Sequence, residues 1–322
     1  MRKALKSLTI VSRSEFLPAN LAQLAIGVAW SINPALGLSW GLGVLLLLSF
    51  LVITMVAAWG AQVNTLYDYK EDSRDERKAE LVQAKEYLGT RKLKGFMMLE
   101  CILSLVFLVL LIYLQGNLIL LFIFVIGSFI TYAYSAPPIR LKSRSWLQVV
   151  GIFFVLSILP LLFVYYTFTA MFDPLFLLFI AGHTLTVYSI IIPAEIRDYY
   201  GDKALDIKTM TVRIGLVKAS LASILMLSVG GLLTGIAYFL RLFELSPILT
   251  VSLIVMAIID IIILRQYKQL YSLTKEYEAS KASDTLAQKI VSLSARNPKW
   301  ITMVTQASVL VAIIFLVGKF LF

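Results

Sequence analysis

The sequence is almost devoid of cysteine, which forms disulfides, and of histidine, which commonly transfers protons in enzymes. Its 322 residues include one cysteine, Cys101, and one histidine, His183. A single cysteine excludes an intrachain disulfide, and we interpret His183, in an apolar stretch, as a packing residue rather than a general base. Only 15% of the residues are charged, whereas 59% are hydrophobic. This composition excludes a soluble domain and predicts a polytopic membrane protein.

Long apolar segments recur along the chain. One helix needs about 20 apolar residues to cross a bilayer. We therefore expect an all-α protein with nine transmembrane helices, in which residues 1–322 form a single integral membrane domain. The candidate spans are residues 16–33, 37–63, 95–115, 117–134, 147–168, 174–195, 218–240, 246–264 and 300–321.

Basic residues gather on one side of this arrangement. If the N-terminus is cytoplasmic, the inside segments hold 27 of the 29 lysine and arginine residues. Cytoplasmic loops are enriched in these residues, so the asymmetry predicts an N-in, C-out orientation with the functional loops on the cytoplasmic face. The net charge of +10 then favours lipid head groups and phosphates over nucleic acid as partners. The inside segments are 1–15, 64–94, 135–146, 196–218 and 265–299.

Two of the inside loops have helical patterns. Residues 73–89 are compatible with a helix that stops at Gly89. Residues 265–299 have the pattern of an amphipathic helix that ends at Asn297-Pro298 and lies along the interface or caps the bundle. Its apolar residues are Leu270, Leu273, Tyr277, Leu286, Ile290 and Leu293.

A ladder of oxygen-bearing side chains ends the second apolar segment. Asn64, Asp68 and Asp72 are spaced four residues apart. On a helix this spacing places them on one face, with neighbouring Cβ atoms roughly 5–6 Å apart. Mg2+ is typically held by one or two carboxylates together with the phosphates of a substrate. The ladder therefore predicts half of a metal-diphosphate site, with solvated loop charges as the alternative.

A second ladder ends the sixth apolar segment. It comprises Glu195, Asp198, Asp202 and Asp206. Asp198 and Asp202 supply the second pair of carboxylates, and both ladders fall on the same predicted face of the membrane. A diphosphate bound between them would be clamped by bridging metal ions.

Basic residues near the ladders could neutralise a departing diphosphate. In the segment after the fourth span, two prolines are expected to hold an extended turn in which Arg140, Lys142 and Arg144 point the same way. Lys203 and Lys208 follow the second ladder. Ordinary basic inside loops are the alternative interpretation.

Together these motifs resemble the signatures of the UbiA superfamily of intramembrane prenyltransferases. The matching segments are Asn64-x-x-x-Asp68-x-x-x-Asp72, Tyr134-Ser-x-Pro-Pro-x-Arg-Leu-Lys142 and Ile196-Arg-Asp198-x-x-x-Asp202-Lys-x-x-x-x-Lys208-Thr209. The resemblance implies a helix bundle around a central cavity, with a Mg2+-bound prenyl diphosphate at its cytoplasmic mouth. It implies that Asn64, Asp68, Asp72, Asp198 and Asp202 are the metal ligands, the four aspartates being catalytic, with Arg140 and Lys142 as basic partners.

Polar residues within the spans extend the candidate site, because burying them in lipid is costly. Tyr188 and Glu195 lie near one face of the sixth predicted helix, so both are candidates for binding substrate, and Tyr188 could contact the acceptor. Asn20 in the first span is a candidate for lining the cavity. Packing through hydrogen bonds between helices is the alternative for each.

Three functions remain open from the sequence. The first is Mg2+-dependent transfer of a prenyl group from a prenyl diphosphate to a lipophilic acceptor, either an aromatic quinone precursor or an isoprenoid ether lipid precursor. The second is a membrane terpene cyclase with the same metal site; it would form a hydrocarbon without an acceptor. The third is a cation-coupled secondary transporter, although transporters usually place ionisable sites near the bilayer midplane.

Two positions depart from the common pattern of the family. Thr65 follows Asn64, and Glu195 stands where the family often has Asn or Asp.

Overall fold

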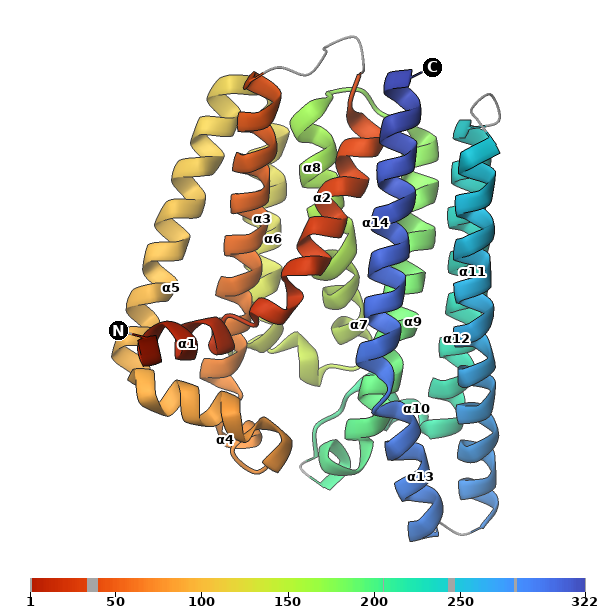
Figure 1. Cartoon of the computed structure of the whole chain (residues 1–322). Coiled ribbons are helices and arrows are strands. Elements are labelled where there is room, and N and C mark those ends of the chain that lie inside the picture. The colour runs from red at the N-terminus through yellow and green to blue at the C-terminus, as the bar shows by residue number, and fades with distance from the viewer. Residues whose placement is uncertain (1, 34–39, 205, 243–246, 281–282, 322) are drawn as a thin grey trace. The chain divides into compact units, whose positions relative to one another are not determined.

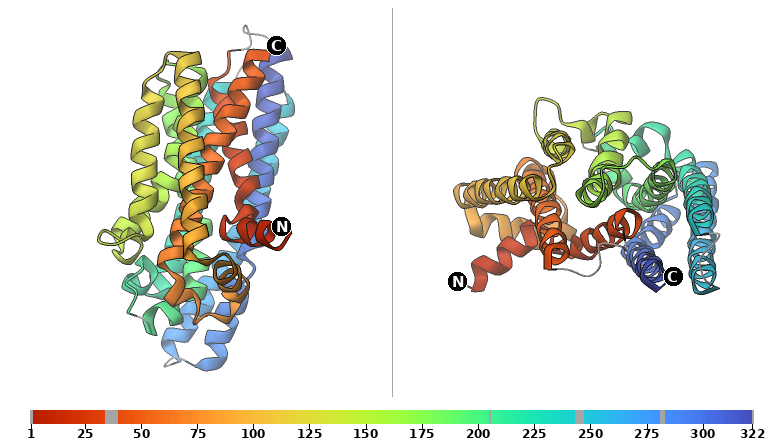
Figure 2. Two further views of the ribbon diagram at one scale, coloured as in Figure 1. Left: turned by 90° about the vertical axis from the view of Figure 1, so that its left-hand side faces the viewer. Right: turned by 90° about the horizontal axis from the view of Figure 1, so that it is seen from above.

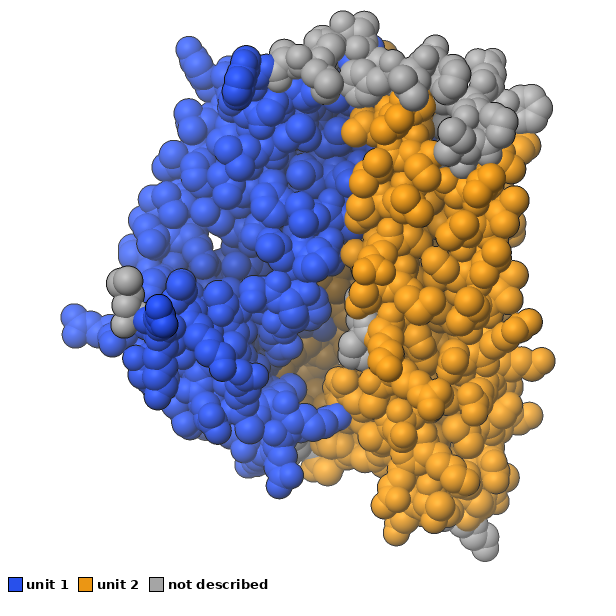
Figure 3. Space-filling model, viewed as in Figure 1, with its two compact units in different colours: residues 1–141, 159–170 blue, residues 142–158, 171–322 orange. Residues whose placement is uncertain are grey.

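The computed structural model describes residues 2–33, 40–204, 206–242, 247–280 and 283–321, and every regular element within these ranges is a helix. The chain forms two compact units, coloured separately in Figure 3. Unit 1 comprises residues 1–141 and 159–170, and unit 2 comprises residues 142–158 and 171–322.

Unit 1 contains the N-terminal helices (Figure 1). They are α1 (Arg2–Val11), α2 (Leu17–Ser31), α3 (Trp40–Tyr67), α4 (Tyr69–Asp72), α5 (Ala79–Gln115), α6 (Ile119–Ser135) and α8 (Leu159–Phe168), with short 3-10 turns at Ser14–Phe16 and Glu76–Lys78. Helix α3 packs along α5, and α2 packs against α8. Gly27 permits the second contact, because a Cβ atom there would lie 2.6 Å from Val164.

Unit 2 contains the remaining helices, seen end-on in the right-hand view of Figure 2. They are α7 (Trp146–Phe153), the π-helical turn η5 (Phe154–Ile158), α9 (Pro174–Ala204), α10 (Met210–Ile214), α11 (Leu216–Leu242), α12 (Pro247–Ala279), α13 (Asp284–Ser294) and α14 (Asn297–Leu321). The 3-10 turn η4 (Leu141–Ser143) begins at the last residue of the first stretch of unit 1.

Helices α9 and α11 approach each other closely because each presents a glycine to a threonine of the other. A Cβ atom added at Gly182 would lie 2.6 Å from Thr234 Oγ1, and one added at Gly230 would lie 2.6 Å from Thr186 Oγ1. Small residues of this kind let membrane helices pack backbone against backbone. The crossing fixes α9, which carries the second acidic ladder.

Apolar side chains cover much of the outer surface of the helices. Phe122 on α6 is 66% exposed and Leu232 on α11 is 63% exposed. Such a surface is incompatible with water and suits lipid. Within the described residues, seven helical segments are long and apolar enough to cross a membrane, and α6 is a shorter apolar helix. The protein is therefore an integral membrane protein.

The predicted spans fall largely on helices, although residues 32–33 and 117–118 are not helical, and 37–39 and 246 lie outside the described residues. Helix α2 has 15 residues and α6 has 17, so they are shorter than the other candidates. The number of nine spans and the N-in, C-out orientation remain predictions. The predicted helix stop at Gly89 is present as a break within a longer helix: Gly89 has the non-helical angles φ 71° and ψ 154°, and α5 bends there and continues to Gln115.

The helical pattern at residues 265–299 is divided differently from the prediction. Helix α12 continues through Leu270 and Tyr277 to Ala279, and α13 begins only at Asp284. The apolar face of α13 is buried as expected, through Leu286, Ile290 and Leu293, and α13 packs against α9 and α12.

Candidate functional site

The first ladder lies where α3 gives way to α4. Asp68 sits between the two helices with φ −96° and ψ 3°, so the predicted continuous helix is interrupted at its centre. The four-residue spacing nevertheless survives, because Asp68 N donates to Asn64 O and Asp72 N donates to Asp68 O, both at 2.8 Å. Asp68 and Asp72 are buried.

Each carboxylate of this ladder already has a basic partner within unit 1. Asp68 Oδ1 lies 3.4 Å from Arg140 Nη2, and Asp72 Oδ1 accepts a 2.6 Å hydrogen bond from Lys78 Nζ. Asn64 Oδ1 accepts a hydrogen bond of 3.2 Å from Ser135 Oγ on α6. The cluster thus combines buried oxygen acceptors with two cations that can also bind an anion.

Arg140 links two acidic residues, since its Nη2 also donates to Glu71 Oε1. Burial acts to lower the pKa of the guanidinium, but the hydrogen bond from Arg140 to Glu71 and the charges of Glu71 and Asp68 raise it above its ordinary value. Arg140 therefore keeps its positive charge. The sequence interpretation missed Glu71, although its position three residues after Asp68 places it on a neighbouring part of the same helical surface.

The turn that carries Arg140 does not have the extended conformation predicted for it. Arg140 has φ 43°, and residues Leu141–Ser143 form a 3-10 turn. The prediction that Arg140, Lys142 and Arg144 point the same way is therefore wrong. It assumed the two-residue period of an extended chain, whereas a 3-10 turn has about three residues per turn. Lys142 belongs to unit 2 and Arg140 to unit 1.

The second ladder lies on unbroken helix α9 of unit 2. Asp198 and Asp202 are four residues apart on α9, as predicted, and both are half-buried. Arg197 donates two hydrogen bonds to Asp198, from Nε to Oδ1 at 3.0 Å and from Nη2 to Oδ2 at 3.3 Å. Asp206 does not continue the face: α9 ends at Ala204, and Asp206 has φ 52°.

Glu195 is the most extensively hydrogen-bonded member of the second ladder. Its Oε1 accepts from Gln148 Nε2 at 3.0 Å and from Tyr188 OH at 3.4 Å, and its Oε2 accepts from Thr211 Oγ1 at 2.7 Å. Gln148 Oε1 in turn accepts from Met210 N at 2.8 Å. Glu195 thereby holds α10 against α7 and α9.

The lysines after the second ladder lie on the segment that this network anchors. The backbone carbonyl of Lys208 accepts hydrogen bonds from Ser145 N and Ser145 Oγ, both at 3.1 Å. Ile207 N donates to Asp202 O at 2.9 Å, which ties the segment back to α9. Lys203 is exposed, with its Nζ 5.6 Å from the centre of the Tyr199 ring.

The remaining candidates lie on α2 and α9. Asn20 is half-buried on α2, and Tyr188 is buried on α9, where its ring packs edge-to-face on Phe153. Gln148 and Thr211 were not predicted from the sequence. Gln148 could have been found as a polar residue inside an apolar span, whereas Thr211 carries no signal of that kind.

The described residues contain no group of three or more His, Cys, Asp or Glu side chains positioned to hold a metal ion. This does not conflict with a magnesium-diphosphate site, because Mg2+ needs only one or two carboxylates when phosphate oxygens complete its coordination. The donors in both ladders are hard oxygen ligands of the type that Mg2+ prefers.

Comparison with known proteins defines the class to which this all-helical membrane protein with two acidic ladders belongs. Residues 20–282 match the UbiA prenyltransferase family, so the chain belongs to that family. No curated protein matches the chain.

Solved structures share the fold at low sequence identity. A UbiA homologue from Archaeoglobus fulgidus, bound to DMAPP and Mg2+, is 18% identical with a TM-score of 0.60, covering 92% of this chain and 99% of its own. A structure of digeranylgeranylglyceryl phosphate synthase is 18% identical with a TM-score of 0.64, covering 99% of both chains. An apo UbiA homologue from Aeropyrum pernix K1 is 15% identical with a TM-score of 0.62, covering 89% of this chain and 97% of its own.

Proposed function

We propose that the protein transfers a prenyl group from a prenyl diphosphate to a lipophilic acceptor in a Mg2+-dependent reaction. The acceptor is an aromatic quinone precursor or an isoprenoid ether lipid precursor. The observation that carries this proposal is the pairing of buried Asp68 with half-buried Arg140 in a chain of the UbiA prenyltransferase family. It places a candidate metal ligand and a permanent cation together at the end of an apolar helix.

The proposed metal ligands are oxygen donors from both ladders: Asn64, Asp68, Asp72, Asp198 and Asp202. Bound Mg2+ would withdraw charge from the diphosphate and so favour its departure. The homologue from Archaeoglobus fulgidus solved with DMAPP and Mg2+ supports this assignment. Asn64, Asp68 and Asp72 belong to unit 1, and Asp198 and Asp202 belong to unit 2.

Basic side chains are proposed to bind the diphosphate and to stabilise its charge as the allylic carbon–oxygen bond breaks. Arg140 is held ready for this by Asp68 and Glu71. Lys142, Lys203 and Lys208 are the further candidates. When a diphosphate enters, Arg140 and Lys78 can exchange a carboxylate partner for a phosphate oxygen while the carboxylates bind metal.

The prenyl cation left by diphosphate departure must be protected from water until the acceptor attacks it. The apolar helices supply that environment. Tyr188 and Asn20 are proposed to contact the substrates, and Glu195 to position the segment that carries Lys208. We propose that the whole site faces the cytoplasm, in the N-in, C-out orientation that the distribution of basic residues predicts.

The experiment that tests the proposal measures diphosphate release from prenyl diphosphates by the purified protein with Mg2+ and a panel of acceptors. Asp68→Asn and Asp198→Asn each remove one charge from a different ladder, and we expect both to lose turnover. Asp75→Asn is the matched control: Asp75 pairs with the neighbouring Arg77 and belongs to neither ladder. Full turnover in both ladder variants would refute the mechanism.

The same assay separates the alternatives. A terpene cyclase would release diphosphate and form a hydrocarbon when no acceptor is present. Ion flux in proteoliposomes, without any prenyl chemistry, would instead support a transporter.

A further inference from the structure

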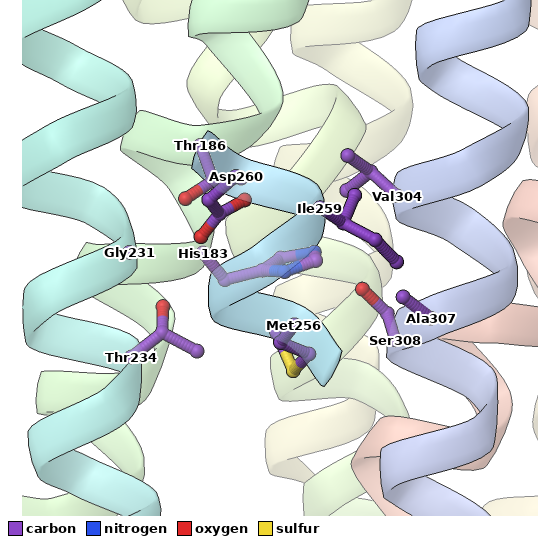
Figure 4. A pocket seen from close by; sticks show the side chains of 10 residues that line it. All are labelled: His183, Thr186, Gly231, Thr234, Met256, Ile259, Asp260, Val304, Ala307 and Ser308. Carbon is purple, nitrogen blue, oxygen red and sulfur yellow. The ribbon is translucent and has the colours of Figure 1, made fainter. Parts of the chain in front are cut away.

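Unit 2 contains a small polar cavity away from both ladders. It has a volume of about 20 Å³ and is lined by α9, α11, α12 and α14. Figure 4 shows the side chains that surround it. Five of its lining residues are polar and one is a methionine: His183, Thr186, Thr234, Asp260, Ser308 and Met256. All lie within helices that can cross a membrane.

Two hydroxyl groups at this cavity have no hydrogen-bond partner. They are Thr186 Oγ1 on α9 and Thr234 Oγ1 on α11. Both threonines are more than nine-tenths buried, with exposures of 8% and 5%. Burying a hydroxyl without a hydrogen bond costs about 1–3 kcal/mol in proteins, and lipid supplies no replacement partner. Two unpaired hydroxyls at one cavity therefore indicate a polar occupant.

Asp260 on α12 adds a carboxyl group to the same cavity. Its Oδ2 lies 2.7 Å from the position that a Cβ atom would take at Gly231 on α11, so the carboxyl occupies the space left by that glycine. No hydrogen bond or ion pair joins Asp260 to the other described residues. An ionisable side chain within a membrane helix normally has a partner or marks a functional site.

We propose that a bound water molecule occupies this cavity and hydrogen-bonds Thr186, Thr234 and Asp260. A cavity needs roughly 10–15 Å³ to hold one water, and the water needs two to four polar partners. The cavity volume suits one water molecule, and two hydroxyls and a carboxyl group line it. The water satisfies polar groups of three different helices and so holds α12 against the α9–α11 pair.

Radiolytic footprinting in a detergent-solubilised or bilayer-embedded sample tests this directly, because hydroxyl radicals formed from a bound water oxidise the nearest reactive side chain. Met256 lines the cavity and is the reporter. Met226 on α11 is a matched reference, since it is also half-buried in unit 2 but does not line the cavity. We expect Met256 to be oxidised several-fold faster than Met226. Equal rates in the unmodified protein would overturn the proposal.

Substitutions then identify the partners of the water. In the Thr186→Val/Thr234→Val double variant, which keeps the side-chain shape but removes both hydroxyls, we expect the Met256 rate to fall to that of Met226. Thr184→Val is the control, because the Thr184 hydroxyl pairs with Ser157 and does not line the cavity. A Met256 rate that is unchanged in a folded double variant would also refute the proposal.

A monovalent cation is the competing occupant, and thermal unfolding distinguishes it. With water in the cavity, the unfolding temperature is the same in sodium chloride and in choline chloride of equal ionic strength. A sodium-specific increase that disappears in Asp260→Asn would show a cation site and overturn the water proposal. Neither measurement depends on prenyl transfer.

Discussion

Gln148 on α7 donates a 3.0 Å hydrogen bond to Glu195 on α9, and the same glutamine accepts from the backbone of Met210 at 2.8 Å. One side chain thus connects a helix that carries two candidate metal ligands to the start of α10. The network is buried, so its hydrogen bonds are not exchanged for water and define one arrangement of the segment.

Replacing Glu195 should therefore destabilise unit 2. Glu195→Ala leaves Gln148 Nε2 and Thr211 Oγ1 without their acceptor, at a cost of about 1–3 kcal/mol for each buried group. Glu195→Gln keeps one acceptor oxygen, so its loss should be smaller. Thermal unfolding in detergent measures whether Glu195→Ala is less stable than Glu195→Gln. The control Glu80→Ala removes only an exposed pair with Lys6 and should change stability by less than about 0.5 kcal/mol. Equal unfolding temperatures for Glu195→Ala and Glu80→Ala would contradict the positioning role.

Arg140 combines an ion-pair role with a positive φ of 43°. Arg140→Ala removes the cation shared by Asp68 and Glu71 and retains the unfavourable backbone conformation. Arg140→Gly removes the same cation but relaxes the backbone, so we expect it to be more stable than Arg140→Ala by about 1 kcal/mol. Both variants should lose prenyl diphosphate turnover. If alanine is the more stable of the two, the turn has a different conformation in solution.

The α9–α11 crossing should tolerate no added methyl group. In Gly182→Ala, the new Cβ atom would lie 2.6 Å from the backbone nitrogen of Thr234 and 2.8 Å from the backbone oxygen of Gly230, neither of which can rotate away. Overpacking of this kind costs about 1–3 kcal/mol. Gly235→Ala on α11 is the control, because nothing lies within 4 Å of its added Cβ. We expect a lower unfolding temperature for the first variant and an unchanged or higher one for the second.

The bend of α5 depends on glycine for a conformational reason rather than a spatial one. Gly89 has φ 71° and ψ 154°, a region that essentially only glycine adopts, yet nothing lies within 4 Å of an added Cβ. Gly89→Ala should cost about 1–3 kcal/mol, whereas Gly95→Ala on the straight part of α5 should gain roughly 0.5–1 kcal/mol. Chemical unfolding of the two variants side by side gives the comparison. A neutral Gly89→Ala would show that the bend straightens readily.

Several features of the fold were predictable from sequence because they depend on local chemistry. Runs of apolar residues marked the helices, glycine marked the bend at residue 89, and four-residue spacing placed Asp198 and Asp202 on one face of α9. Each of these follows from helix geometry and from the cost of leaving backbone groups unpaired in lipid.

Tertiary structure decided which polar side chains meet. The sequence does not place Gln148 opposite Glu195, or Arg140 against Glu71, because these partners are 47 and 69 residues apart and their contact depends on how helices pack. The interruption at Asp68 and the 3-10 turn after Arg140 likewise arise where the chain must change direction between helices. Sequence alone determined a membrane-embedded helical protein with two acidic ladders. Packing determined the pairing of Arg140 with Asp68 and Glu71, and it brought Thr186, Thr234 and Asp260 to one cavity, because these side chains come from segments far apart in the sequence.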